Sequence, residues 1–180
     1  MKRLPLLLVV LLSLAVAFSA ESAARPTGKL KVSTPGVVLE LKMGTKPAPL
    51  PNGREIPLPV GSYQPAKITC YAQQAGAKKP EMWSIECKGP FGELKEISVT
   101  EGEVADVQAG TPFQLKPVIY SMTTKAGVRT IPIGFTITGK AGEVYSASTI
   151  MKNKIRVPAP QLKILDEKGT VLAQGTFEYG

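Results

Sequence analysis

The run Val38-Leu-Glu-Leu-Lys42 alternates apolar and polar side chains with a period of two residues. Lys29-Leu-Lys-Val32, Ile97-Ser-Val-Thr100 and Lys154-Ile-Arg-Val157 repeat the pattern. Successive side chains of a β-strand point to opposite faces, so this alternation is typical of antiparallel strands with one buried face. The runs therefore predict a sheet-based fold.

Glycine-containing turn signals separate these runs, at residues 51–53, 101–103, 139–142 and 166–169. Beyond the first 24 residues, no stretch of about 11 residues has the apolar period of a helix. The chain of 180 residues is 43% hydrophobic and 20% charged, which is ordinary globular composition. We therefore predict an all-β fold built as an antiparallel β-sandwich.

The first 24 residues have the three parts of a secretory signal peptide. Lys2 and Arg3 precede an apolar run from Leu4 to Phe18, and Ser22-Ala-Ala24 supplies the small residues that a signal peptidase requires. We predict a signal-peptide helix over residues 1–24, cleavage after Ala24, and a periplasmic or extracellular mature chain without a membrane span. An uncleaved membrane anchor is the alternative, but the run is shorter than the roughly 20 residues of a spanning helix.

A glycine and a proline in Ala109-Gly-Thr-Pro-Phe113 separate two strand-rich halves. We place a domain boundary there, which gives a first β domain over residues 28–110 and a second over residues 111–180. Each half is close to the lower size limit for an independent core, so we expect the halves to pack on each other. One continuous sandwich is the alternative.

Two sequence patterns resemble secreted bacterial modules. Ile56-Pro-Leu-Pro-Val-Gly-Ser-Tyr63 and the later segment Ile97–Val107 are similar to the L-x-x-G-x-Y step and the closing hairpin of PEGA-type and transthyretin-like carboxypeptidase-regulatory modules. The second half resembles an immunoglobulin-like or fibronectin-like module, with strands expected at 113–120, 131–137, 143–148, 155–157, 162–165 and 171–179. These resemblances imply an immunoglobulin-like/transthyretin-like sandwich that serves as an accessory module in the envelope, and they imply no particular ligand.

The two cysteines of the chain, Cys70 and Cys87, lie in the strand-like segments 66–72 and 83–88. A hairpin folded about residues 78 and 79 would place them opposite each other, and an oxidising compartment would allow a disulfide between them. We expect that disulfide, with two buried free thiols as the alternative. We also expect Trp83, Tyr71 and Phe91, near this hairpin, to fill the core rather than to form a ligand platform.

The chain contains no histidine, which removes histidine-dependent catalysis, histidine-containing zinc sites and histidine pH switches. The remaining catalytic candidates are two serine–lysine spacings, Ser121 with Lys125 and Ser148 with Lys152, and two carboxylate pairs, Glu101 with Glu103 and Asp166 with Glu167. The serine–lysine spacings are one residue longer than Ser-x-x-Lys, and the carboxylates lie in expected turns. We predict no enzyme, no catalytic, cofactor-binding or metal-binding residue, and no cofactor.

The formal net charge is +8. In a continuous strand, Lys152, Lys154 and Arg156 would project from one face, which makes them a candidate anion-binding face for an acidic polymer. The alternative, which we prefer, is a solvated face that protects a sheet edge from aggregation. Nucleic acid is not an expected partner, because stacking aromatics are not interleaved with these cations.

The sequence does not identify a biochemical activity. The interpretation that fits it best is a non-enzymatic secreted or periplasmic β-sandwich module with a structural or binding role at the cell envelope. The alternatives are an anionic polysaccharide- or polymer-binding protein, and an accessory subunit of an envelope assembly that pairs with a partner protein through its strand edges.

Overall fold

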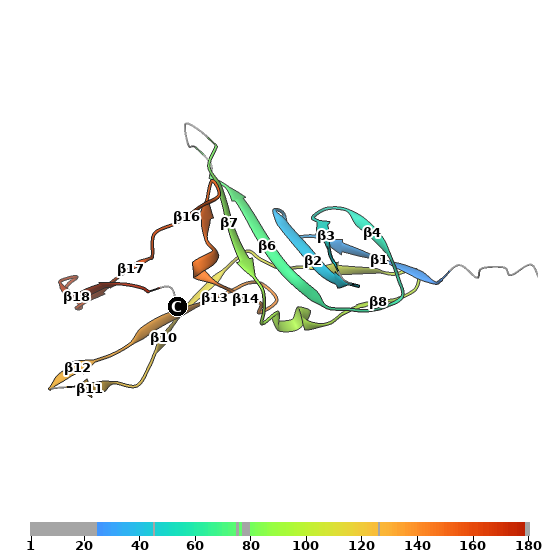
Figure 1. Ribbon diagram of the computed structural model, residues 1–180. Coiled ribbons are helices and arrows are strands. Elements are labelled where there is room, and N and C mark those ends of the chain that lie inside the picture. Colours follow the sequence, from blue (N-terminus) through green and yellow to red (C-terminus); the bar gives the residue numbers. More distant parts are fainter. Residues whose placement is uncertain (1–24, 45, 75, 77–79, 126, 179–180) are drawn as a thin grey trace, which may run out of the picture.

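The computed structural model describes residues 25–178, except positions 45, 75, 77–79 and 126. The predicted signal peptide, residues 1–24, lies outside the described residues. The described chain is all-β, apart from two short 3₁₀ helices at Gly92–Lys95 and Ala147–Thr149 (Figure 1). Nearly all of its strand pairs are antiparallel, which confirms the predicted fold class at this level.

Two main sheets form what we call the body. The larger sheet has the strand order β16 (Ile155–Arg156), β15 (Met151–Lys152), β7 (Met82–Cys87), β6 (Pro65–Gln73), β2 (Val37–Met43) and β3 (Lys46–Pro51). The smaller sheet has the order β4 (Glu55–Pro59), β1 (Thr27–Val32) and β9 (Val104–Val107), with β1 and β9 parallel. The short strands β5 (Gly61–Tyr63) and β8 (Ile97–Val99) pair beside them.

One buried cluster joins the two sheets, as expected for a β-sandwich. Leu30 and Val32 of β1 meet Leu39 and Leu41 of β2 and Ile68 of β6 in this cluster, and each is at most 1% exposed. Their polar neighbours along the strands point away from the core, because side chains alternate between the two faces. The strands predicted from the alternation at 29–32, 38–42 and 97–100 are thus confirmed.

The larger sheet takes strands from both predicted halves. Met151 and Lys152 of β15 pair with Ser84 and Trp83 of β7, so the chain beyond residue 110 extends a sheet that begins before it. The proposed division at residue 110 into two domains stays a prediction.

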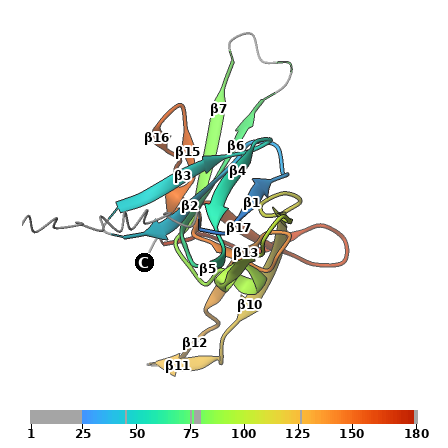
Figure 2. The same cartoon turned by 90° about the vertical axis from the view of Figure 1, so that its right-hand side faces the viewer.

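Two β-hairpins extend from the body, and we call them arms (Figures 1 and 2). The first arm consists of β10 (Gln114–Ile119) and β13 (Ile133–Thr138), with β11 (Thr123–Lys125) and β12 (Val128–Thr130) at its far end. Its inner end continues into β14 (Val144–Tyr145), which pairs with β13. The second arm consists of β17 (Gln161–Leu165) and β18 (Val171–Thr176).

Candidate functional site: an apolar groove between the arms

The first arm has one apolar face. Its register aligns three apolar cross-strand pairs on that face, Leu115 with Ile137, Pro117 with Phe135, and Ile119 with Ile133. The opposite face carries mainly polar residues such as Gln114, Lys116 and Thr136, because neighbours along a strand alternate in direction. Leu115 and Ile119 remain 66% and 71% exposed. The apolar face therefore lacks a covering layer over much of its length.

The second arm approaches this face. At the inner end of the arms, the Phe177 ring lies edge-on to the Phe135 ring, with 4.7 Å between the ring centroids. Further out, Leu162 and Ile164 of β17 line the same hollow as Ile133 of the first arm. The two arms thus touch near the body and leave a gap between their apolar side chains beyond that contact.

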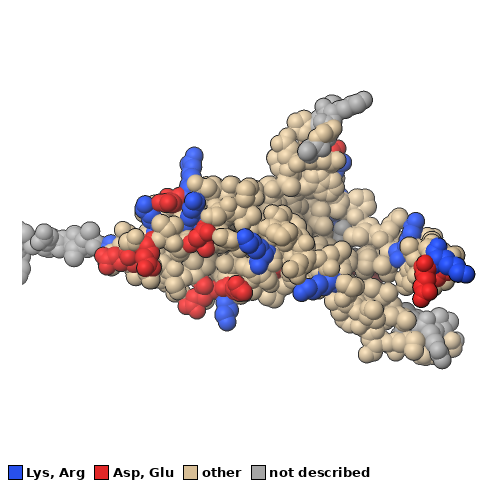
Figure 3. Space-filling view, turned by 180° about the vertical axis from the view of Figure 1, so that it is seen from behind, with Lys and Arg blue, Asp and Glu red and all other residues tan. Residues whose placement is uncertain are grey.

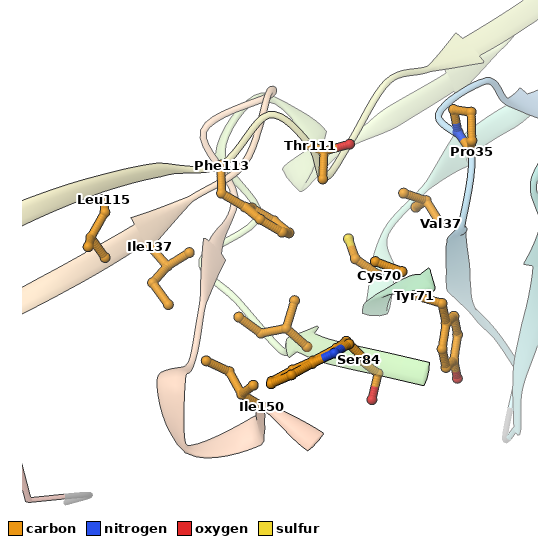
Figure 4. A pocket seen from close by; sticks show the side chains of 13 residues that line it. Pro35, Val37, Cys70, Tyr71, Ser84, Thr111, Phe113, Leu115, Ile137 and Ile150 are labelled. Carbon is orange, nitrogen blue, oxygen red and sulfur yellow. The ribbon is translucent and has the colours of Figure 1, made fainter. Parts of the chain in front are cut away.

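A pocket of about 330 Å³ lies where the first arm meets the body (Figure 4). Phe113, Leu115 and Ile137 line the side of the arm, and Tyr71 and Trp83 line the side of the larger sheet. Tyr71 is 46% exposed and Trp83 is half-buried. These two aromatics therefore do not fill the core, contrary to what their sequence context predicts. Phe91, by contrast, packs against the core.

Two further hollows, of about 540 Å³ and 660 Å³, continue this pocket between the arms. The first shares Leu115, Ile137 and Ile150 with the pocket at the body, and the second shares Leu162 and Phe177 with the first. The three hollows are thus neighbours that share lining residues, and we call them together the inter-arm groove. Its lining is mainly aliphatic and aromatic, the chemistry of sites that bind apolar groups.

A buried carboxylate fixes the inner end of the first arm. Glu143 is fully buried, and its carboxylate accepts hydrogen bonds from the Gly110 N–H at 2.5 Å, the Ala141 N–H at 2.9 Å and the Tyr145 hydroxyl at 2.9 Å. The loop that precedes the arm, at Gly110, is thereby tied to the turn at Ala141 that follows β13. Gly110 has a φ of +81°, and a Cβ there would lie 2.8 Å from the Cys70 sulfur, so this crossing requires glycine.

Cys70 belongs to the same network. Its thiol donates to the Tyr145 hydroxyl, 3.2 Å away, and that hydroxyl donates to Glu143. Burial raises the pKa of Cys70 to about 11, against a smaller opposing effect of the hydrogen bond with Tyr145. Burial likewise raises the pKa of Cys87. Both groups are therefore protonated and unreactive at neutral pH, although Cys70 lines the groove.

The predicted disulfide is wrong, because both cysteines are buried free thiols. The β6–β7 register pairs Ile68 with Cys87 and Cys70 with Ile85, so the cysteines are diagonal neighbours and not opposite each other. Diagonal neighbours in a sheet are separated by about 7–8 Å, beyond the Cα separation that a disulfide usually spans. The hairpin itself was predicted correctly, but its register differs by two residues from the expected one.

The predicted strand carrying Lys152, Lys154 and Arg156 on one face is also wrong. Asn153 and Lys154 have φ angles of +50° and +67°, which makes them the centre of a two-residue hairpin turn between β15 and β16. Asn153 fixes this turn against β7, because its side-chain oxygen accepts from the Met82 N–H at 2.9 Å. Lys152 pairs with Ile155 across the hairpin, so Lys152 and Arg156 point to opposite faces.

Lys152 is committed to other partners. Its ammonium lies 2.8 Å from the Glu81 carboxylate and 5.4 Å from the centroid of the Trp83 ring. Over the face of the body seen in Figure 3, basic and acidic side chains are interspersed and form no single-sign surface. Lys152, Lys154 and Arg156 therefore do not form the anion-binding face that a continuous strand would have given them.

The remaining candidates from the sequence occupy turns and surfaces. Glu103 accepts from the Thr100 hydroxyl within its turn. Asp166 accepts from the Lys168 and Thr170 N–H groups, which lower its pKa, the Thr170 contact having the larger effect. The Ser148 hydroxyl lies 2.8 Å from that of Ser146. Among the described residues, no group of three or more Asp, Glu, His or Cys side chains is arranged to hold a metal ion.

Sequence reasoning missed both Glu143 and the groove. Glu143 directly follows the turn signal Gly139–Gly142, and its apolar neighbours Ala141, Val144 and Tyr145 were the only sign that it is buried. The groove has no local signal, because it depends on where two hairpins lie relative to each other.

No protein-family model, curated protein or solved structure matches this chain. Within the described residues, neither helix has the length or the apolar character needed to cross a membrane.

Proposed function

We propose that this protein is a non-enzymatic binding module of the cell envelope that holds an apolar segment of a partner protein in the inter-arm groove. The observation that carries this function is the row of three adjacent hollows, lined by Leu115, Ile137 and Phe135 on one arm and Leu162 on the other. A groove that runs from the body along both arms fits an extended chain better than one small molecule.

The arms need such a partner for their own order. A two-stranded hairpin is marginally stable alone, and three or more strands with a covered apolar face are required for independent stability. Leu115 and Ile119 are exposed on an arm that has two strands over most of its length. A bound segment would remove these side chains from water, at a gain of about 25 cal/mol per Å² of apolar surface.

The charge of the first arm favours an acidic partner. Residues 107–142 contain four basic residues, Lys116, Lys125, Arg129 and Lys140, and no acidic residue. An apolar segment flanked by aspartate or glutamate would therefore be attracted to this arm, and its association would slow as salt screens the charges.

Export places this activity in the periplasm or outside the cell. That location follows from the signal-peptide pattern of residues 1–24. The resemblance to transthyretin-like and immunoglobulin-like modules supports the same setting, since such modules serve as accessory parts of envelope proteins. We do not extend the proposal to an anionic polymer, because Lys152 and Arg156 lie on opposite faces of their hairpin.

Site-specific photo-cross-linking tests the proposed function in the exported protein. A photoreactive amino acid at Leu115, in the groove, should yield a discrete cross-linked partner from intact envelopes. The matched control places the same amino acid at Val60, which is 42% exposed on the body and does not line any of the three hollows. Identical cross-linking patterns from both positions, or none from Leu115, would contradict the proposed function.

A further inference from the structure

Three of the edge strands of the body and the first arm contain proline. β3 contains Pro47, Pro49 and Pro51, β4 contains Pro57 and Pro59, and β10 contains Pro117. Each of these strands lies at the edge of its sheet. Proline has no N–H to offer a further strand, and natural proteins use it to prevent edge-to-edge pairing. Among the described edge strands of at least five residues, only β17 and β18 contain no proline.

Of these two strands, β18 is the less protected. Its sequence, Val171-Leu-Ala-Gln-Gly-Thr176, has no charged residue, whereas β17 carries Lys163. All six residues of β18 are exposed, and Leu172 is 65% exposed. An uncharged and fully exposed edge strand is a template for pairing with another strand.

The outward-pointing backbone groups of β18 can be assigned. The Phe177 N–H donates to the Pro160 carbonyl, 2.9 Å away, and therefore points toward the β17 side of the hairpin. Backbone direction alternates along the regular part of an antiparallel strand, so the N–H groups of Gln174 and Thr176 point toward the free edge, whereas the register shifts at Leu172 and ends the alternation there. Their carbonyl oxygens point the same way, which leaves a row of donors and acceptors available there.

We propose that β18 pairs with β18 of a second copy of this chain, antiparallel about a two-fold axis at Gln174. Two hairpins joined in this way form a four-stranded sheet, which meets the strand number that one hairpin lacks. A two-fold arrangement uses the same surface on both copies and closes without forming a filament. Ala173 of one copy then lies opposite Gly175 of the other.

The charge distribution suits a second copy at this strand. Each chain has a net charge of +8, so two copies repel each other at long range. The uncharged β18 is a place where two copies can approach without bringing like charges into direct contact. Salt screens the long-range repulsion, so the association should strengthen as ionic strength rises. Binding of an acidic segment in the groove has the opposite salt dependence.

The first test measures the mass of the exported protein by light scattering over a range of concentrations. The wild type should reach twice the monomer mass, and Gln174→Pro should stay monomeric because it removes an outward N–H without removing a hydrogen bond inside the hairpin. Gln174→Ala is the matched control and should still dimerise. Circular dichroism of all three proteins establishes whether they remain folded. A monomeric wild type, or a Gln174→Pro variant that dimerises as well as the wild type, would overturn this pairing.

The second test examines the register. The two Gln174 residues form a hydrogen-bonded pair about 5.5 Å apart at Cα, which is within the range of a disulfide. Gln174→Cys should therefore form a covalent dimer on oxidation, while Glu101→Cys, in an exposed turn of the body, should not. Equal cross-linking of the two variants would contradict the register.

β18 lines the outermost hollow of the groove, but the two inner hollows are lined without it, so self-association and partner binding there can fail independently. The Leu115 photo-cross-link, repeated in the Gln174→Pro background, reports in a monomer on the two inner hollows of the groove, which Leu115 lines and Gln174 does not. A retained cross-link with lost dimerisation supports both functions. A lost cross-link in a wild type that still dimerises contradicts the groove and leaves the β18 pairing intact.

Discussion

Strands β2 and β10 have similar alternating sequences but very different surroundings. Leu39 and Leu41 of β2 are fully buried beneath the smaller sheet, whereas Leu115 and Ile119 of β10 are 66% and 71% exposed. The two strands differ in what covers their apolar faces. The smaller sheet covers β2, whereas the second arm covers only part of the apolar face of β10. A strand pattern therefore specifies an apolar face without specifying what covers that face.

Truncating one leucine in each region should produce the largest contrast in stability. Leu39→Ala removes packed atoms from the core, and we expect a loss of about 3 kcal/mol in the free energy of unfolding. Leu115→Ala removes atoms that are mostly in water, and we expect a change within about 0.5 kcal/mol for the protein without a partner. Urea denaturation followed by circular dichroism measures both values. Similar losses for the two variants would mean that the first arm is covered in solution.

The junction between body and arm should be the next most sensitive place. Glu143→Gln replaces a carboxylate oxygen by an amide NH₂, which cannot accept from the Gly110 or Ala141 N–H. We expect a loss of about 2 kcal/mol, because a buried donor is left without a partner. Glu101→Gln, in an exposed turn, is the matched control and should leave stability unchanged. Equal effects of the two substitutions would show that the network at Glu143 contributes little.

The sequence predicted those features that depend on neighbours along one strand. Alternation identified β1, β2 and β8 correctly because one face of each strand meets the core and the other meets polar surroundings. It failed at residues 154–157, because Asn153 and Lys154 form a turn of the kind that normally carries glycine. The Cys70–Cys87 pairing failed for a related reason, since hairpin register is set by the geometry of a connection that composition does not specify. The groove could not be predicted, because it forms between elements whose placement is tertiary.

The buried thiols should make the stability of the body decline in mild alkali. Burial raises the pKa of Cys70 in the folded protein from 9.0 to about 11. Above pH 9 the unfolded chain loses the Cys70 proton while the folded protein retains it, so stability falls as pH rises. For Cys70 we expect a loss of up to about 1 kcal/mol between pH 9 and 10. The stability of Cys70→Ala should decline less steeply with pH, since only one of the two buried thiols, Cys87, then contributes. Identical slopes would show that Cys70 is accessible to solvent.

The smallest effect should come from the turn that separates Lys152 from Arg156. Lys154 has a φ of +67°, a conformation in which glycine carries no steric cost, and Asn-Gly is the preferred pair for a two-residue turn of this kind. Lys154→Gly should therefore stabilise the protein by about 0.5 kcal/mol. This value is a balance, because glycine relieves the strain at this φ in the folded protein but has more conformational freedom in the unfolded chain. Lys152→Gly is the comparison variant, because Lys152 lies in β15 and forms an ion pair with Glu81. This substitution should destabilise the protein. Thermal unfolding at a fixed pH measures both changes. If residues 152–157 instead formed the continuous strand that their alternation predicts, glycine would weaken the strand at either position, and Lys154→Gly would lower stability as well.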